Sequence, residues 1–329
     1  MKTPAFWNAA EPGYRQNLLA PIGNVYGNIT ARRMQRPGQK VGCPVICVGN
    51  FTAGGTGKTP AVLALSNLFK PYFGTIMALT RGYGGMAKAP FLVDPKRHSF
   101  EAAGDEALLL ARVMPVIVAK DRLAGARLAL DQGADLILMD DGFQNPHLHK
   151  DFSLIVVDAK TGFGNGHCLP AGPLRAPLSA QIPFADAFLV MGEGVVPELF
   201  DTGKPVFRGS FEVEPNPALL QKPLLVFAGL GRPEKVFDSL RSLGADVRQA
   251  VSFADHHAYT KKDIARLEAM TRADDLRLVT TQKDFMRLKD RYPAFVASLV
   301  IAEGRTVFDD PEGLETLLLR RLTASQENG

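Results

Sequence analysis

The chain has 329 residues, 46% of them hydrophobic, so it can bury the core of one large α/β domain or of two smaller ones, and we expect two. Its 38 basic and 34 acidic residues leave a net charge of only +4, which is too small to indicate a nucleic-acid-binding protein. Three cysteines, no signal-peptide pattern and no apolar run near the ~20 residues of a membrane span predict a cytoplasmic protein, or one attached to the membrane from the cytoplasmic side.

Residues 1–40 carry an amphipathic segment that we interpret as a membrane-interface helix. Apolar residues recur at spacings of three and four and basic residues follow them: Leu18, Ile22, Val25, Tyr26 and Ile29, then Arg32, Arg33, Arg36 and Lys40. An apolar stripe with a basic end suits an anionic membrane surface. A helix packed on its own domain would show the same pattern, and Pro21, Gly23 and Gly27 weaken the helix itself.

The stretch NFTAGGTGKTP, residues 50–60, predicts a phosphate-binding loop. It follows an apolar run at 45–48, typical of a buried parallel strand, and precedes a helix with Pro60 in its first turn. In this context the glycines let backbone N–H groups converge on an anion at a helix N-terminus. The predicted nucleotide-binding residues are Thr52, Ala53, Gly54, Gly55, Thr56, Gly57, Lys58 and Thr59. Lys58 would reach the β- and γ-phosphates, and the Thr59 hydroxyl would reach Mg²⁺.

This loop departs from the usual pattern, because Thr52 stands where the first glycine is expected. The doublet Gly54-Gly55 is more similar to the variant loops of partitioning-type ATPases. Those loops, however, carry a lysine where this chain has Ala53.

Further apolar runs alternate with amphipathic helical stretches and predict a P-loop NTPase-like parallel sheet with helices on both faces. The strands are expected at 75–80, 115–119, 135–139, 153–158 and 186–191, and the helices at 60–70, 104–113 and 121–132. A proline-containing stretch at 206–223 reads as a linker, after which the α/β pattern restarts and ends in the helix PEGLETLLLRRL. We therefore expect a kinase-like domain over 41–215 and a smaller α/β domain over 216–329.

Two pairs of acidic residues are candidates for the chemistry. Asp140 and Asp141 follow the strand at 135–139, where the metal partner of a P-loop enzyme lies. Asp105 and Glu106 open a helix, and acidic residues there either favour the helix N-terminus or supply the general base of phosphoryl transfer to a hydroxyl. Spacing alone does not choose between these two roles.

Other motifs bring cations and histidines to loop positions. Arg81 and Tyr83 follow the second strand, where an arginine suits an anionic substrate or belongs to a simple turn. The ordered loop 162–179 contains Arg175 as its strongest cation. In the second domain, His256 and His257 lack further ligands at metal spacing, so one of them handles or orients a proton across an interdomain cleft, or both lie in a surface turn. Lys283 and Asp284 would face the same cleft.

Taken in order, the motifs VGNFTAGGTGKTP, TRGYGG, GDEALLLA, DDGFQ, GNGHCLPAGPLR, FAGLGRP, FADHHAY and TTQKD resemble those of the tetraacyldisaccharide 4'-kinases of lipid A biosynthesis, over nearly the whole chain. The resemblance implies ATP- and Mg²⁺-dependent phosphorylation of the 4'-hydroxyl of an acylated glucosamine disaccharide 1-phosphate, which gives lipid IVA. It also implies a peripheral enzyme, expected to be monomeric, on the cytoplasmic face of the bacterial inner membrane.

The resemblance assigns roles to single positions. Lys58 falls where the family contacts phosphate, Asp105 where it has its catalytic base, and His256 where a histidine assists that base. The implied metal residues are Thr59, Glu106, Asp140 and Asp141, and the implied substrate residues are Arg81, Tyr83, Gln144, Asn165 and Arg175. Departures from the family pattern at Asn145, Ala176 and Gln282 concern secondary contacts.

Two other kinds of protein share part of this pattern. The Gly54-Gly55 doublet favours a P-loop switch NTPase of the partitioning or metallochaperone type, but Ala53 in place of the signature lysine counts against it. A non-catalytic scaffold at the membrane would leave Asp105, His256 and the loop 162–179 without a role. Formation of a phosphorylated lipid would separate the kinase from both.

Overall fold

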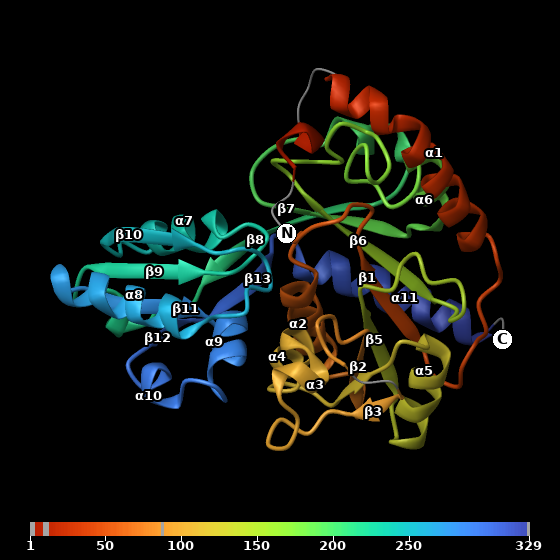
Figure 1. Ribbon diagram of the computed structural model, residues 1–329. Coiled ribbons are helices and arrows are strands. Elements are labelled where there is room, and N and C mark those ends of the chain that lie inside the picture. The colour runs from red at the N-terminus through yellow and green to blue at the C-terminus, as the bar shows by residue number, and fades with distance from the viewer. Residues whose placement is uncertain (1–3, 9–12, 87–88, 328–329) are drawn as a thin grey trace.

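The computed structural model describes residues 4–8, 13–86 and 89–327, whose strands form two sheets lying side by side (Figure 1). The larger sheet has the strand order β13-β8-β7-β6-β1-β5-β2-β4-β3, and the smaller has the order β10-β9-β11-β12. The strands of the larger sheet are β1 (Val45–Gly49), β2 (Ile76–Thr80), β3 (Phe91–Leu92), β4 (Val116–Val118), β5 (Leu136–Asp140), β6 (Phe152–Asp158), β7 (Ala187–Met191), β8 (Val206–Val213) and β13 (Gly304–Phe308). The predicted strands from 45 to 191 are confirmed to within one residue at each end.

The larger sheet is parallel except at its two edges, where β3 and β13 run antiparallel to their neighbours. Every residue of β1, β2, β5, β6 and β7 is buried, because helices cover both faces. The helices of this domain are α1 (Tyr14–Met34), α2 (Lys58–Phe69), α3 (Phe100–Ala103), α4 (Asp105–Leu110), α5 (Arg122–Asp131), α6 (Leu178–Gln181) and α11 (Pro311–Glu327), with short 3-10 helices η1 (Ala5–Asn8), η2 (Ile182–Phe184) and η3 (Pro197–Thr202). The predicted fold class is therefore confirmed.

The smaller sheet forms the core of the second domain, and its strands are all parallel. Val236 and Leu240 of α7 cover one face, and Ile264 and Leu267 of α8 cover the other. Its elements are β9 (Leu224–Ala228), α7 (Glu234–Ser242), β10 (Val247–Ser252), α8 (Lys261–Ala273), β11 (Arg277–Thr281), α9 (Gln282–Leu288), α10 (Pro293–Val296) and β12 (Val300–Ala302), preceded by η4 (Pro217–Leu219). Of these helices, α9 packs against α4 of the first domain.

The end of the chain differs from the predicted domain boundary of 216–329. β13 pairs antiparallel with β8, and Leu314, Leu318 and Leu322 of α11 are buried in the core of the larger sheet (Figure 1). Leucines spaced by four make one apolar face, and both faces of the smaller sheet are already covered by its own helices. Similarly, the first part of the predicted linker is β8, so only 214–223 connects the two sheets at this point.

Helix α1 packs on the first domain through its small residues. A Cβ atom at Gly23 would lie 2.7 Å from the Cys168 carbonyl oxygen, and one at Gly27 would lie 2.6 Å from the Cys168 sulfur. The glycines that weakened the helix prediction therefore permit this close approach. The apolar stripe faces away from the protein: Leu18, Ile22, Val25, Tyr26 and Ile29 are all exposed. No helix within the described ranges combines the length and the apolar content needed to cross a bilayer.

Candidate active site

The phosphate loop lies between β1 and α2, as predicted. Gly54 and Gly57 have φ of 125° and 100°, in the region that favours glycine. The loop 162–179 holds the start of the phosphate loop. The Ala53 N–H donates to the Pro173 carbonyl at 2.7 Å, and Thr52 forms an isolated antiparallel β-bridge with Leu174. The backbone of the phosphate loop is therefore fixed from one side and open on the other.

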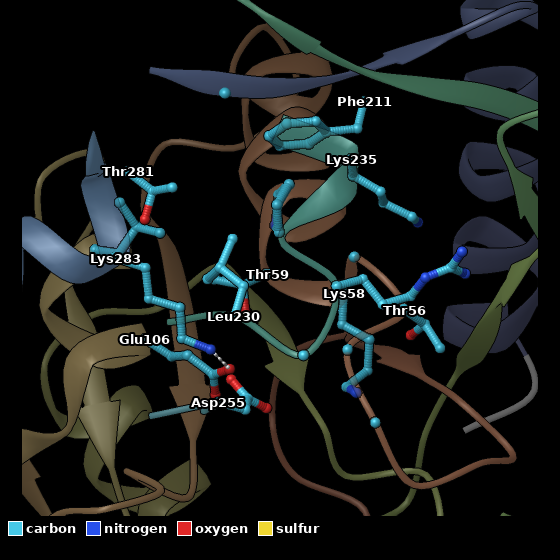
Figure 2. A pocket seen from close by; sticks show the side chains of 18 of the residues that line it. Thr56, Lys58, Thr59, Glu106, Phe211, Leu230, Lys235, Asp255, Thr281 and Lys283 are labelled. Atoms are coloured by element: carbon cyan, nitrogen blue, oxygen red, sulfur yellow. Dashed lines mark hydrogen bonds and ion pairs between the residues drawn. The ribbon is translucent and has the colours of Figure 1, made fainter. Parts of the chain in front are cut away.

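A cavity of about 400 Å³ lies on the open side, between the two domains. Lys58, Thr59, Glu106 and Lys283 project into it, and Phe211 lies at its opposite, apolar end (Figure 2). The apolar lining comes from Pro60, Leu63, Leu109, Phe211, Leu230 and Val236. One end thus suits phosphate and acid–base chemistry, and the other suits a flat apolar group.

Asp140 ends β5 directly beside α2. It accepts a hydrogen bond from the Thr59 hydroxyl at 2.9 Å, and its second oxygen, Oδ1, is buried with no hydrogen-bond partner among the described residues. Burial and the charge of Glu106 raise the pKa of Asp140 to about 7. An unsatisfied buried carboxylate oxygen beside a threonine hydroxyl fits an oxygen-preferring divalent cation such as Mg²⁺.

Asp141 has a different environment from Asp140. Arg175 donates to its two oxygens at 2.9 and 3.3 Å, and the Lys58 ammonium lies 3.7 Å from it. Burial would raise the pKa of Asp141, but Lys58 and Arg175 hold it well below its usual range. Gln144 supports Arg175, accepting from it at 3.3 Å and donating to the Asn50 carbonyl at 2.7 Å. The two adjacent aspartates therefore face different partners, Thr59 and the two cations.

Asp105 lies at the centre of a buried ionic network. Its carboxylate is fully buried; Arg287 donates to Oδ2 at 2.5 Å, and His256 Nδ1 lies 3.1 Å from the same oxygen. Burial opposes ionisation, but Lys283, His256 and Arg287 hold the pKa of Asp105 well below its ordinary value. Arg287 also donates to Asp284 at 2.8 Å and to the Gly229 carbonyl at 2.7 Å. Asp105 thus lies behind the cavity wall and is held as a carboxylate.

His256 belongs to this network and also lines the cavity. It has a positive φ of 55°, and its ring lies 4.8 Å from that of Tyr83, centroid to centroid. Both side chains line the cavity, as does Glu106, whose carboxylate accepts from Lys283 at 2.9 Å (Figure 2). His256 and Lys283 both line this cavity from the side of the second domain. Asp284 instead lies buried beneath the cavity, where it accepts from Tyr259 and from the Gly229 N–H.

Three of the expected substrate residues lie away from the cavity lining. Arg81 is exposed. Asn165 uses its side chain to tie the N-terminal segment to the loop 162–179, donating to the Phe6 and Ala171 carbonyls at 3.1 and 3.0 Å. Gln144 contacts Arg175, which does line the cavity. Of the five expected residues, Tyr83 and Arg175 are therefore the ones brought together around the phosphate loop.

Sequence reasoning missed two groups of charged residues at the domain interface. Arg287 follows Lys283 by four positions on α9, so both face the Asp105-Glu106 pair on α4. The spacing of four could therefore have identified Arg287 from the sequence as a second cation on the same helix face as Lys283. Arg232 and Lys235 pair with Asp158 across the interface, and nothing local in the sequence indicated this contact.

The fold and the cavity define a P-loop phosphotransferase, with its site between two α/β domains and with a cavity-lining histidine, paired to a buried aspartate, opposite the phosphate loop. Comparison with known proteins agrees. A sequence model of the tetraacyldisaccharide-1-P 4'-kinase family matches residues 15–323. The tetraacyldisaccharide 4'-kinases of Methylobacterium nodulans and Rhodopseudomonas palustris are 47% and 44% identical to this chain, covering 98% and 99% of it and 96% and 98% of their own lengths.

The crystal structure of LpxK from Aquifex aeolicus in complex with ATP superposes with a TM-score of 0.75 at 29% identity, over 93% of this chain and 99% of that one. The chain belongs to the tetraacyldisaccharide-1-P 4'-kinase family and is accordingly a kinase of lipid A biosynthesis. The alternative of a partitioning-type switch NTPase is not favoured by these matches.

Proposed function

We propose that this chain transfers the γ-phosphate of ATP to the 4'-hydroxyl of a tetraacyldisaccharide 1-phosphate, giving lipid IVA. The observation that carries the proposal is the interdomain cavity, which the phosphate loop lines from one domain and His256 from the other. A kinase needs a polyphosphate site and a proton acceptor within one water-poor space, and few other reactions need this pair.

The nucleotide would lie along the length of the cavity. Its phosphates would bind the N–H groups of residues 54–59 and Lys58, and its adenine would enter the apolar end beside Leu63, Phe211 and Val236. Thr59 and Asp140 would hold Mg²⁺, with Glu106 close enough to raise the pKa of Asp140. When bound, Mg²⁺ neutralises charge on the phosphate oxygens.

The proton of the acceptor hydroxyl would pass to the Asp105–His256 pair acting as one unit. His256 lines the cavity, and Asp105 lies behind it, 3.1 Å from Nδ1. A carboxylate in this position orients the imidazole. Arg175, beside Asp141 and Lys58, is suited to bind the charge that develops on the transferred phosphate.

Transfer of labelled γ-phosphate from ATP to detergent-dispersed tetraacyldisaccharide 1-phosphate tests this proposal. We expect Lys58→Ala to lower the rate by about 10²- to 10³-fold and Asp105→Asn by about 10²- to 10⁴-fold, because each removes an interaction of the transition state. Lys70→Ala is the control, since Lys70 lies exposed just after α2 and contacts Asn67. ATP hydrolysis without a lipid product would instead indicate a switch NTPase.

We also propose that α1 docks the enzyme to the cytoplasmic face of the inner membrane. Its exposed stripe places Leu18 and Ile22 at 74% and 58% exposure, on a helix already packed through its opposite face. Arg32, Arg33 and Arg36 are exposed at its end. Exposed apolar rows with adjacent cations bind anionic lipid surfaces, and the acceptor is itself anchored by acyl chains.

Co-sedimentation with vesicles containing anionic phosphatidylglycerol tests the docking. The variant Leu18→Ser/Ile22→Ser/Val25→Ser should bind at least about tenfold more weakly, because each leucine-sized side chain contributes roughly 1.5 kcal/mol or more on burial. Leu220→Ser is the matched control, since Leu220 is similarly exposed, at 56%, but lies in the second domain. Equal binding by the triple variant and the intact protein would contradict the proposal.

A further inference from the structure

A second cluster of charges joins the two domains at the other flank of the phosphate loop. Asp158 ends β6, and its side chain is 3% exposed. Arg232 and Lys235, from the turn into α7, both form ion pairs with it, and the Lys235 ammonium lies 2.5 Å from Oδ2. The proposed reaction assigns no role to any of the three.

The carboxylate of this cluster is rigidly held. Asp158 Oδ1 accepts from the backbone N–H groups of Lys160 and Thr161 at 3.1 and 3.2 Å, and from the Thr161 hydroxyl at 3.3 Å. Burial would raise the pKa of Asp158, but Lys235 and Arg232 lower it below its ordinary value. Asp158 is therefore a fixed anion of the first domain, and it holds the two cations of the second domain in position.

The segment that carries the two cations contacts the phosphate loop. A Cβ atom at Gly231 would lie only 3.2 Å from the Gly55 nitrogen, so the turn that carries Arg232 touches the phosphate loop itself. Arg232 and Lys235 both line the 400 Å³ cavity together with Lys58 and Thr59, and Figure 2 shows Lys235 and Thr56 on the same flank of it. Arg232 also lines a neighbouring cavity of about 350 Å³.

The single negative charge of Asp158 does not balance the two cations, and its carboxylate does not occupy all of their hydrogen-bond donors. One carboxylate faces two cations, so the cluster keeps an excess of one positive charge at the cavity. Arginine has five N–H donors and lysine has three, and Asp158 forms an ion pair with one nitrogen of each. With the side chains only 23% and 26% exposed, the remaining donors are partly desolvated and are strong partners for an anion.

We propose that Arg232 and Lys235 bind the β- and γ-phosphates of the nucleotide from the side opposite the phosphate loop, with Asp158 as the residue that positions them. This inference rests on the proposed function, which supplies the nucleotide. The cations would reach the β- and γ-phosphates and not the α-phosphate, because Gly231 contacts Gly55, early in the loop, whereas the α-phosphate lies nearer the start of α2. The second domain thereby contributes directly to polyphosphate binding.

Equilibrium competition against a fluorescent ATP analogue, with ATP and AMP as competitors, tests this assignment on the full chain. Arg232→Gln and Lys235→Gln should each weaken ATP binding about tenfold, the usual effect of losing one charge-assisted hydrogen bond, and leave AMP binding within about twofold. Lys235→Arg should restore most of the ATP affinity. Arg241→Gln is the control, because Arg241 lies on the same helix and pairs only with the exposed Asp238 among the described residues.

Asp158→Asn should weaken ATP more than AMP, and Asp158→Glu should recover part of the loss, whereas a purely structural role would weaken both nucleotides alike. Wild-type affinity for ATP in both cation variants, or an equal loss for ATP and AMP, would overturn the inference. If one variant fails to fold, the other decides, since each keeps one cation on Asp158. Failure of the intact protein to bind ATP would instead overturn the proposed function.

Discussion

The two ion-pair clusters that flank the phosphate loop are built alike but differ in exposure. In each, the first domain provides a carboxylate and the second provides basic side chains: Asp105 faces Arg287 and His256, and Asp158 faces Arg232 and Lys235. Asp158 ends β6 on one side of β1, whereas Asp105 begins α4, which connects to β4 on the other side of β1, so the clusters fall on opposite sides of the loop that follows β1. Arg287 is 1% exposed, whereas the two cations on Asp158 are about a quarter exposed.

This difference shows how one kind of contact serves two purposes. In the buried cluster every charge is compensated by protein groups: Arg287 contacts two carboxylates and a carbonyl, and Asp284 accepts from Tyr259, Thr281 and the Gly229 N–H. Such a network fixes the geometry of Asp105. In the Asp158 cluster the only carboxylate that pairs with the two cations among the described residues is Asp158, and both cations line the cavity, which is an arrangement suited to a ligand.

Replacing Arg287 by methionine should have the largest effect on stability. Asp105 and Asp284 would both lose their buried cation, and unpaired buried charges cost about 3 to 5 kcal/mol of unfolding free energy. Denaturant titration measures this, with Arg291→Met as the matched control, since Arg291 lies four residues on and is 49% exposed in its pair with Glu101. Similar losses for Arg287→Met and Arg291→Met would remove the contrast between buried and exposed pairs.

Replacing Asp158 by asparagine should cost less, about 1 to 2 kcal/mol of unfolding free energy at neutral pH, because its partners remain partly solvated. The pKa of Asp158 is lowered in the folded protein, so its contribution is fully present above the ordinary carboxyl pKa of about 4 and decreases as the pH falls below that value. The stability difference between wild type and Asp158→Asn should therefore shrink in acid. A difference that stays constant from pH 7 to pH 3 would show that Asp158 does not act through its charge.

The sequence predicted the elements whose signals are local. The central strands are continuous apolar runs because both of their faces are buried, and the phosphate loop and Asp140 follow directly from strand ends. β8 and β13 were not recognised because they are the last two strands on one side of the sheet and have mixed burial, so their patterns resemble a linker and a loop. The C-terminal helix was predicted to belong to the second domain but packs on the larger sheet, since its leucine spacing defines an apolar face but does not show which sheet that face covers.

The predicted site was incomplete for a related reason. Asp105 and Arg287 are separated by 182 positions, and whether a helix-opening aspartate caps its helix or joins a catalytic network depends on what the fold places against it. The same holds for Asp158, whose partners lie in the other domain. The resemblance to a family named Asp105 and His256, but residues that act only through tertiary contact carried no recognisable motif.

The return of β13 to the larger sheet makes the second domain an insertion with two covalent connections, 214–223 and Glu303. These connections are adjacent, because the Glu214 N–H donates to the Glu303 carbonyl at 2.8 Å and β8 pairs with β13 beside them. The covalent links between the two domains therefore all lie at one edge of the larger sheet, next to the β8–β13 pair. His256, Lys283, Arg232 and Lys235 all belong to the inserted domain, so that edge sets the position of four side chains of the cavity lining together.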